Sequence, residues 1–312
     1  MIEVYRGSPN TWECDEMGHM NVRFYAAKMM EGIGAFAAYA GMPHAFLTNA
    51  YSTLRPSDNH IRFIREAHAA HPFYMTAGVL DVTDSSVKVY LELRHGDGRP
   101  CATYQVWLDH IDTITETPFP WSPKARAAFE DIKTDFDPKL GPRSVSMETV
   151  PAASATMEDA DKIGAPIIGR GLILPDQCDA LGWMKPEFFL GRVSDSVPNL
   201  LHDWRQSISR ETLDQTDSDE TTPMGAAVLE YRLIYRKWPR AGDLFVMRSA
   251  IGQQSGKTHG LFHWMLDPKT GDAWMTSQVA AINFDLETRK AIEPPTPMKD
   301  AFKKIAPAGL WL

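Results

Sequence analysis

The chain has 312 residues, which is long enough for two domains and for cores that need neither disulfides nor a structural metal. Its hydrophobic share of 44% and charged share of 23% are globular values, so disorder, collagen-like repetition and coiled coil are excluded for the chain as a whole. The formal net charge of -8 has the wrong sign for a protein that neutralises nucleic-acid phosphates, and we expect no nucleic-acid partner.

The composition and the first residues predict a cytoplasmic protein with no membrane partner. Three cysteines cannot form a disulfide framework, which fits a reducing compartment. Glu3 and Arg6 stand where a secretory signal would carry its apolar core. The longest uncharged stretch, residues 32–54, is broken at Pro43 and then turns polar, so it predicts a buried helix followed by a loop.

The first predicted element with a clear pattern is a helix over residues 24–40. Only Lys28 and Glu31 are charged there, and apolar side chains occupy most of its circumference, so we expect a sheet to cover it. Alternating apolar and polar residues then predict four strands. These strands are His60–Glu66, Phe73–Val82, Val87–Arg94 and Cys101–Ile111.

A proline-rich stretch over residues 115–165 predicts a linker, with one short amphipathic piece at residues 124–133. The order of elements then repeats. A helix that opens with proline is expected over Pro186–Gln206. The four strands predicted after it are Ala227–Arg236, Leu244–Ile251, Thr258–Leu266 and Ala273–Phe284.

An internal repeat sets the predicted organisation. Cys14–Phe24 aligns with Cys178–Phe188 at a constant shift of 164 residues, and Cys, Asp, Gly, Met and Phe recur in register. We therefore predict a first unit at 1–114, the linker at 115–165, a second unit at 166–290 and a tail at 291–312.

The segment Trp12–Tyr25 reads W-x-C-D-x-M-G-H-M-N-x-x-F-Y. It resembles the opening motif of the hotdog-fold acyl-CoA thioesterases of the 4-hydroxybenzoyl-CoA thioesterase type, and the order of elements fits that family as well. The resemblance implies an α+β fold in which an antiparallel sheet wraps a long central helix. It also implies that two tandem hotdogs form a pseudo-dimer with active sites between them.

By motif position, the resemblance implies that Asp15 is the catalytic carboxylate and that Asp179 is its counterpart in the second copy. His19 and Asn21 are expected to hold the carboxylate or a water molecule. The second copy departs from the motif, with Trp183 in place of the histidine and lysine in place of the asparagine. The residues expected to contact substrate are Gly18, Met20, Tyr25, Gly182 and Trp183.

Thioester hydrolysis needs a carboxylate together with donors aimed at the oxygen that becomes negative. The unpaired N–H groups at a helix start can serve as those donors. In the family the donor commonly comes from the partner unit. The Asp15 site should therefore be completed by residues 182–188, and the Asp179 site by residues 18–24.

The same residues and the nearby histidines allow three other interpretations. Asp15 and Asp179 are alternatively helix N-caps. Cys14 is alternatively a thiol nucleophile with His19 as its base, although the second copy has no such histidine. His60, His68 and His71 show no carboxylate or thiolate at ligand spacing, so no metal is expected.

The expected function is hydrolysis of an acyl-CoA to a free acid and coenzyme A. No cofactor is expected beyond coenzyme A as part of the substrate. The alternatives are a noncatalytic acyl-CoA-binding hotdog protein and a hotdog hydratase or dehydratase, whose Asp and His motif is not found. The assembly state, including a homo-oligomer of pseudo-dimers, is left open.

Overall fold

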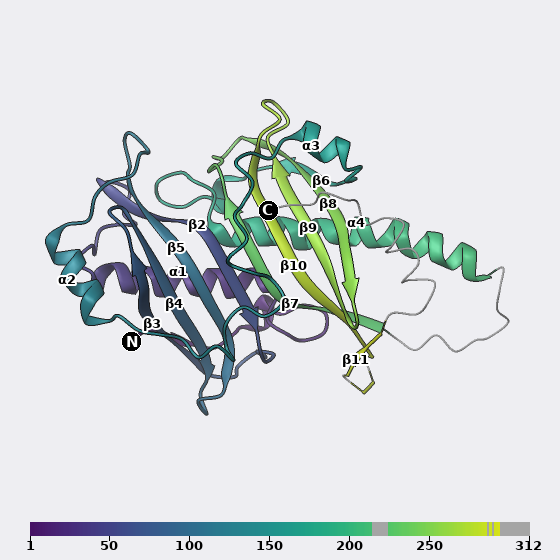
Figure 1. Ribbon diagram of the computed structural model, residues 1–312, viewed down its shortest axis with the longest axis horizontal. Coiled ribbons are helices and arrows are strands. Elements are labelled where there is room, and N and C mark those ends of the chain that lie inside the picture. The colour runs from purple at the N-terminus through teal and green to yellow at the C-terminus, as the bar shows by residue number, and fades with distance from the viewer. Residues whose placement is uncertain (214–223, 286, 289, 294–312) are drawn as a thin grey trace. The chain divides into compact units, whose positions relative to one another are not determined.

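The computed structural model describes residues 1–213, 224–285, 287–288 and 290–293 (Figure 1). The chain divides into two compact units that are interleaved in sequence. The first unit comprises Met1–Arg143, Ile173–Gly191 and Trp238–Gly242, and the second comprises Ser144–Leu172, Arg192–Lys237 and Asp243–Leu312. The second copy of the motif therefore lies in the first unit.

The first unit is built on a five-stranded antiparallel sheet with the order β1-β3-β4-β5-β2. The four predicted strands are confirmed, and β2 begins at Ser52 rather than His60. The elements are β1 (Ile2–Gly7), the short 3-10 helix η1 (Thr11–Glu13), α1 (Val22–Tyr39), β2 (Ser52–Phe63), β3 (Phe73–Val82), β4 (Ser86–His95), β5 (Pro100–Asp112) and α2 (Pro123–Asp131).

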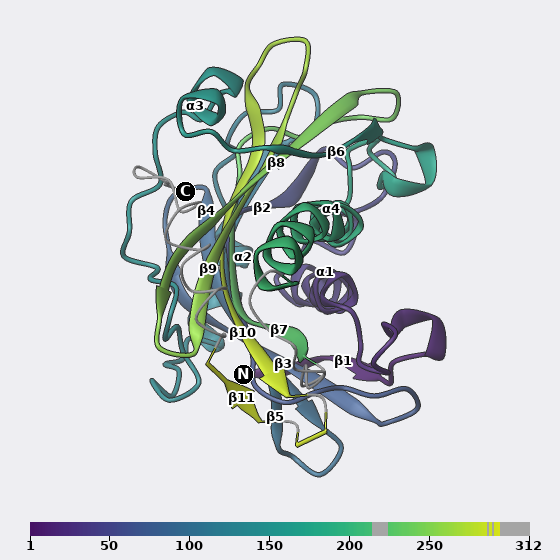
Figure 2. The ribbon, with the colours of Figure 1, turned by 90° about the vertical axis from the view of Figure 1, so that its right-hand side faces the viewer.

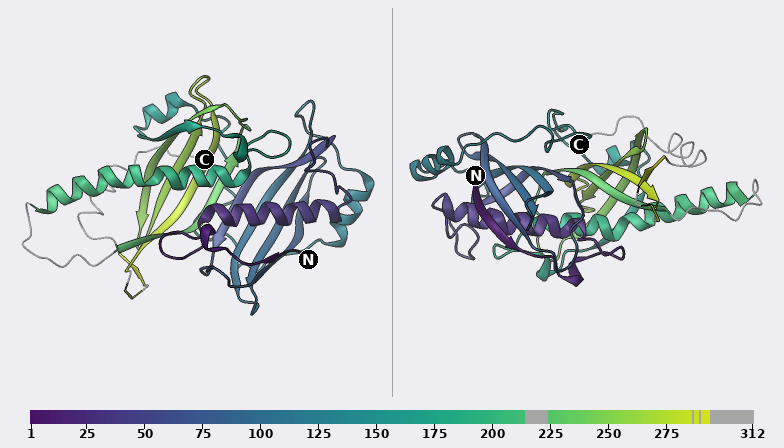
Figure 3. Two further views of the ribbon diagram at one scale, coloured as in Figure 1. Left: turned by 180° about the vertical axis from the view of Figure 1, so that it is seen from behind. Right: turned by 90° about the horizontal axis from the view of Figure 1, so that it is seen from below.

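Helix α1 lies across one face of this sheet, as the view from behind shows (Figure 3). Met29, Ile33 and Phe36 are fully buried, which confirms the prediction of a covered helix. Gly32 allows α1 to approach β3 closely, because a Cβ atom at this position would lie 3.0 Å from the sulfur of Met75.

The second unit repeats the arrangement, with the strand order β7-β10-β9-β8-β6 and β11 paired to β10. Its predicted strands are also confirmed. The elements are α3 (Met157–Lys162), β6 (Ile167–Leu172), β7 (Met224–Tyr235), β8 (Leu244–Ser255), β9 (Thr258–Leu266), β10 (Ala273–Asp285) and β11 (Ala291–Ile292). Helix α4 (Pro186–Leu213) follows the short 3-10 helix η2 (Pro175–Gln177). Part of its length beyond Arg192 lies against one face of this sheet, and Figure 2 shows the helix nearly end-on.

The predicted linker contains ordered structure in both units. The predicted amphipathic piece forms α2, whose Phe129 stacks on Phe36 of α1. Helix α3 was not predicted, because its 6 residues make fewer than two turns and are too short to show a helical period. Farther along, the Glu230 carboxylate accepts hydrogen bonds from the backbone N–H groups of Ser144 and Val145. The segment is therefore bound to the fold at several points.

In the part of the chain that the structure describes, no helix is both long enough and apolar enough to cross a membrane. Most of the predicted tail, residues 294–312, lies outside the described residues.

Candidate active site

The two copies of the motif form loops with the same hydrogen bonds. We call residues 14–20 the first motif loop and residues 178–184 the second, and a β-bridge joins the ends of each. In the first, Asp15 Oδ1 accepts from the N–H groups of Met17 and His19 at 3.0 and 3.1 Å. In the second, Asp179 Oδ1 accepts from the N–H groups two and four residues later, at 2.9 and 3.0 Å. Each carboxylate is thus held in one orientation by its own loop.

A glycine with positive φ makes this loop possible in both copies. Gly18 has φ 79° and Gly182 has φ 85°, values that favour glycine over residues with a side chain. Each glycine N–H donates to the carbonyl oxygen of the loop's aspartate at 3.0 Å. The aspartate and glycine of the repeat are therefore required by one local conformation.

Asp15 does not act as the N-cap of α1. Asn21 has that role, because its side-chain oxygen accepts from the N–H of Arg23 at 3.0 Å. Asn21 is thus explained by local structure, and its predicted catalytic contribution stays a prediction. The carboxylate of Asp15 is instead oriented by the N–H groups of its own loop.

Asp179 lies near Arg55, a cation on a strand that is distant in sequence. Burial raises the pKa of the Asp179 carboxyl, and the backbone N–H groups of its loop and the positive charge of Arg55 on β2 oppose that shift. The guanidinium of Arg55 also lies over the ring of Trp183, at 4.2 Å from its centroid. Strand β2 therefore contributes a positive charge to the second motif loop, within the same unit.

A cavity of about 400 Å³ opens next to the second motif loop. Ala180 and Leu181 of that loop line one side, directly after Asp179. The full lining is Thr48, Asn49, Ala50, Tyr51, Thr113, Ile114, Ala180, Leu181, Trp183 and Arg240. The lining combines apolar side chains with hydroxyl, amide and guanidinium groups that can form hydrogen bonds.

The starts of α1 and α4 are neighbours within the first unit. Arg23 in the first turn of α1 lies over the ring of Phe188, at 4.0 Å from its centroid. Burial raises the pKa of Glu187 in the first turn of α4, and the charge of Arg23 opposes the shift. Asp179 raises the same pKa further, so the starts of both helices lie near the second motif loop. That residues 18–24 complete the Asp179 site stays a prediction.

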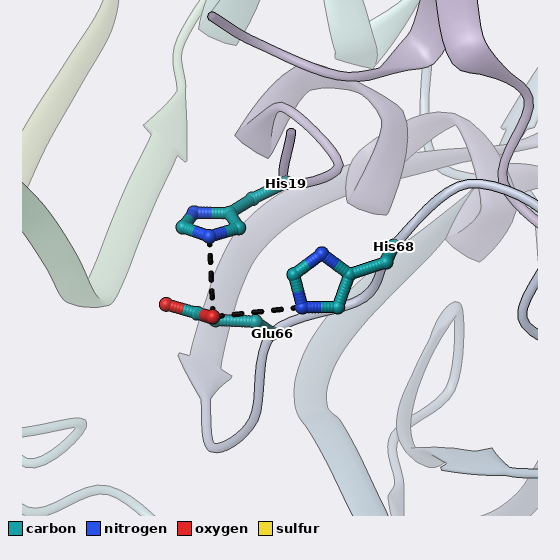
Figure 4. A group of neighbouring side chains, drawn as sticks. All are labelled: His19, Glu66 and His68. Carbon is teal, nitrogen blue, oxygen red and sulfur yellow. Dashed lines mark ion pairs between the residues drawn. The ribbon is translucent and has the colours of Figure 1, made fainter. Parts of the chain in front are cut away.

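His19 contacts a carboxylate that the sequence analysis did not identify. Its Nε2 lies 3.1 Å from Oε2 of Glu66, and His68 lies on the other side of the same oxygen at 3.6 Å (Figure 4). The expectation that His68 has no carboxylate at ligand spacing is therefore wrong. Glu66 follows β2 directly and stands two residues before His68, but a single sequence does not reveal which loop packs there.

The predicted substrate contacts differ in their exposure. Met20 and Tyr25 are buried, and the Tyr25 carbonyl accepts a hydrogen bond from the Tyr104 hydroxyl at 3.2 Å. These are the surroundings of packing residues, and a substrate role for both stays a prediction. Trp183 is only 2% exposed, yet it lines the cavity together with Arg240.

The thiol interpretation gains no support from the surroundings of Cys14. Its sulfur donates to the carbonyl oxygen of Asn10 at 3.5 Å, and burial raises the pKa of the thiol. A raised pKa disfavours the thiolate that nucleophilic attack requires. His19, the candidate base, directs Nε2 toward Glu66 instead.

A family model described as the thioesterase-like superfamily matches residues 9–129 and 173–302. The chain belongs to this superfamily, which confirms the resemblance identified in Trp12–Tyr25. The two matched regions, each with a helix and an antiparallel sheet, fit a tandem hotdog.

Three solved structures are similar over most of their length. A putative oleoyl thioesterase from Lactobacillus plantarum has 11% identity and a TM-score of 0.64, covering 89% of this chain and 94% of that one. An acyl-ACP thioesterase from Bacteroides thetaiotaomicron has 13% identity and a TM-score of 0.60, with coverages of 90% and 96%. A 12:0-ACP thioesterase from Umbellularia californica has 9% identity and a TM-score of 0.64, with coverages of 90% and 93%. At these identities the likeness concerns the fold. None of the curated proteins compared with this chain matches it.

Proposed function

We propose that this protein hydrolyses acyl thioesters, with acyl-CoA as the substrate, and that its two repeats act together as a pseudo-dimer of hotdogs. The observation that carries the proposal is the pair of motif loops, each of which fixes one aspartate by the same hydrogen bonds. The superfamily supports the reaction class. Two of the similar solved structures are named as acyl-ACP thioesterases, so acyl groups on a carrier protein are candidate substrates as well.

Each motif contributes a different feature to the reaction. Asp15 has the fuller motif, with His19 and Asn21. Asp179 has a cavity beside it and Arg55 nearby. The carboxylate either removes a proton from the attacking water or attacks the thioester carbonyl to form a mixed anhydride, which water then hydrolyses to the free acid. In both routes the thiolate leaves and takes up a proton. We assign the larger share of turnover to Asp179.

The oxyanion donor distinguishes the two sites. In α1 the N–H groups of Arg23 and Phe24 already bond to Asn21, and we assign the oxyanion contact to the N–H of Val22, the first helical residue. The equivalent residue of α4, at the same shift of 164, is Pro186, which has no N–H. If each site takes its donor from the other repeat, Asp179 receives a donor and Asp15 receives none.

The test is thiol release from acyl-CoAs of increasing chain length and from an acyl carrier protein, with a substrate-free control for the protein's own cysteines. Wild type is expected to release thiol, and Asp179→Asn is expected to lower kcat/KM by about 10²-fold or more. Asp15→Asn should retain most of the activity. A larger loss in Asp15→Asn would reverse the assignment of sites and leave hydrolysis intact.

Two further outcomes would reject hydrolysis itself. Acyl-CoA binding without thiol release would favour the noncatalytic binding protein. Addition of water to an unsaturated acyl-CoA, with the thioester left whole, would favour the hydratase.

A further inference from the structure

His19, Glu66 and His68 direct three ligand-type atoms to one point (Figure 4). The Nε2 atoms of the two histidines lie 3.1 and 3.6 Å from Oε2 of Glu66, and the three ligand atoms lie within 4.8 Å of one another. His19 comes from the first motif loop, and the other two come from the segment after β2. Residues 47 to 49 positions apart in sequence thus converge at one place.

The two separations from Glu66 suit a tetrahedral metal ion, and the two histidine nitrogens lie within 4.8 Å of each other. Zinc binds imidazole nitrogen and carboxylate oxygen at about 2.0–2.1 Å, so two ligands of one tetrahedral ion stand about 3.3 Å apart. Both separations from Glu66 lie within about 0.3 Å of that value. The set of two histidines and one carboxylate leaves a fourth position for water.

Hydrogen bonding accounts for one of the two imidazoles but not for the other. A proton between His19 Nε2 and Glu66 explains a separation of 3.1 Å, whereas 3.6 Å is too long for a hydrogen bond from His68. The other ring nitrogen of His68, Nδ1, lies 3.1 Å from the carbonyl oxygen of Gly18. A carbonyl only accepts, so Nδ1 carries the proton and donates it there.

This second contact fixes the tautomer of His68. In the neutral ring a proton on Nδ1 leaves a lone pair on Nε2, which then faces a negative carboxylate oxygen. Two lone pairs that face each other repel, and either a second proton on the ring or a metal cation between them removes that repulsion. An N–H donated to a backbone carbonyl is also the outer contact that orients metal-binding histidines in proteins.

Solvent can reach the cluster. The side chains of Glu66 and His68 are 51% and 41% exposed, while His19 is 12% exposed and anchors the group to the fold. The nearest charged neighbour in sequence, Arg65, directs its guanidinium to the carbonyl oxygen of Pro100. His71 stacks edge-on against His68, with 5.6 Å between ring centroids. A dication and its water therefore have an entry path.

We propose that His19, Glu66 and His68 form a binding site for a divalent transition metal of the zinc class. The ion joins the first motif loop to the segment after β2, where Met20 already donates its N–H to the carbonyl of Ala67 at 2.8 Å. Occupancy therefore stiffens the loop that carries Asp15. The proposal does not depend on thioester hydrolysis, because the site is defined by its ligands alone.

The test uses full-length protein without a histidine tag, stripped of metal and titrated with Zn²⁺ by calorimetry and with Co²⁺ by visible absorption. Wild type is expected to bind one equivalent, and Co²⁺ should give the intense bands of a tetrahedral site. The melting temperature of wild type should rise with zinc concentration. Glu66→Gln and His68→Ala are each expected to weaken binding at least tenfold and to remove the tetrahedral bands.

His71→Ala is the matched control, because His71 contacts His68 but does not belong to the ligand set. Its affinity should equal that of wild type. The proposal is wrong if stripped wild type binds neither ion, or if Glu66→Gln and His68→Ala bind as wild type does. Equal weakening by His71→Ala would also overturn it, since the effect would then come from general disturbance of the loop.

Discussion

The guanidinium of Arg55 lies 4.2 Å from the centroid of the Trp183 ring. Trp183 occupies the position of His19 in the repeat, and Arg240 approaches the same ring at 5.4 Å. Glu116 binds both cations, at 3.5 Å from Arg55 and 2.7 Å from Arg240. Where the first motif loop has a histidine paired with a carboxylate, the second has an indole in contact with two cations. The contact with the indole holds Arg55 near Asp179.

Arg55→Gln should shift the acidic limb of kcat/KM to higher pH. Burial raises the pKa of Asp179, and the positive charge of Arg55 opposes part of this rise because it favours the charged carboxylate. Removal of the positive charge therefore raises this pKa further, and a higher pH is needed to ionise the carboxylate. Arg55→Lys is the control that keeps the charge. A pH profile of Arg55→Gln that superimposes on wild type would exclude Asp179 as the titrating group.

Trp183→Leu should lower the free energy of unfolding by about 3 kcal/mol, through loss of buried ring area and of two cation contacts. Trp183 is 2% exposed, and its backbone N–H and carbonyl, which the substitution leaves in place, close the hydrogen bonds of the loop. Trp183→Phe keeps a ring and should lose less. Urea unfolding measures both. Trp12→Leu, at a residue 77% exposed, is the matched control and should change little. Equal losses at the two positions would contradict the role given to Trp183.

Val22→Pro should lower kcat far more than it lowers stability. Proline is tolerated at the first position of a helix, and this substitution removes one N–H without changing the cap formed by Asn21. Loss of one oxyanion donor is expected to lower kcat by about 10²-fold. Val22→Ala keeps the N–H and should retain activity. Full activity of Val22→Pro would assign the oxyanion contact to a different donor.

Most of the elements could be predicted because their sequence periods are strong and local. Phe24, Met29, Ile33 and Phe36 mark α1 as covered, and alternation marks the eight main strands. The first eight residues of β2, 52–59, were not predicted because Pro56 interrupts the alternation and a register shift follows it. Helix α3 was not predicted because a helix of 6 residues is too short to show a helical period.

The site could be predicted only as far as the motif extends. Asp15, Gly18 and their partners in the repeat depend on one loop conformation, which the residues themselves encode. Arg55 and Glu66 lie on and after β2, and their part in the site follows from which loop packs on that strand. Tertiary packing brings these charges close to the motif loops, and the spacing of residues in a single sequence does not reveal that packing.

Acid should destabilise the second unit through two buried histidines. Burial lowers the pKa of His263 to about 3 and that of His259 to about 4, against an ordinary value of 6.5. Between pH 6.5 and these values the unfolded chain binds protons that the folded chain does not. The free energy of unfolding therefore falls as pH falls, by about 1.4 kcal/mol per pH unit for each histidine.

His263→Asn should remove one of these two contributions, since the amide does not titrate and can keep the contact that Nδ1 makes with the Ser249 hydroxyl at 2.6 Å. Urea unfolding between pH 7 and pH 4.5 measures the slope for wild type and variant. His44→Asn, at an exposed histidine, is the control and should keep the wild-type slope. An unchanged slope in His263→Asn would show that this ring takes up its proton in the folded chain as readily as in the unfolded one, contrary to its complete enclosure between β8 and β10.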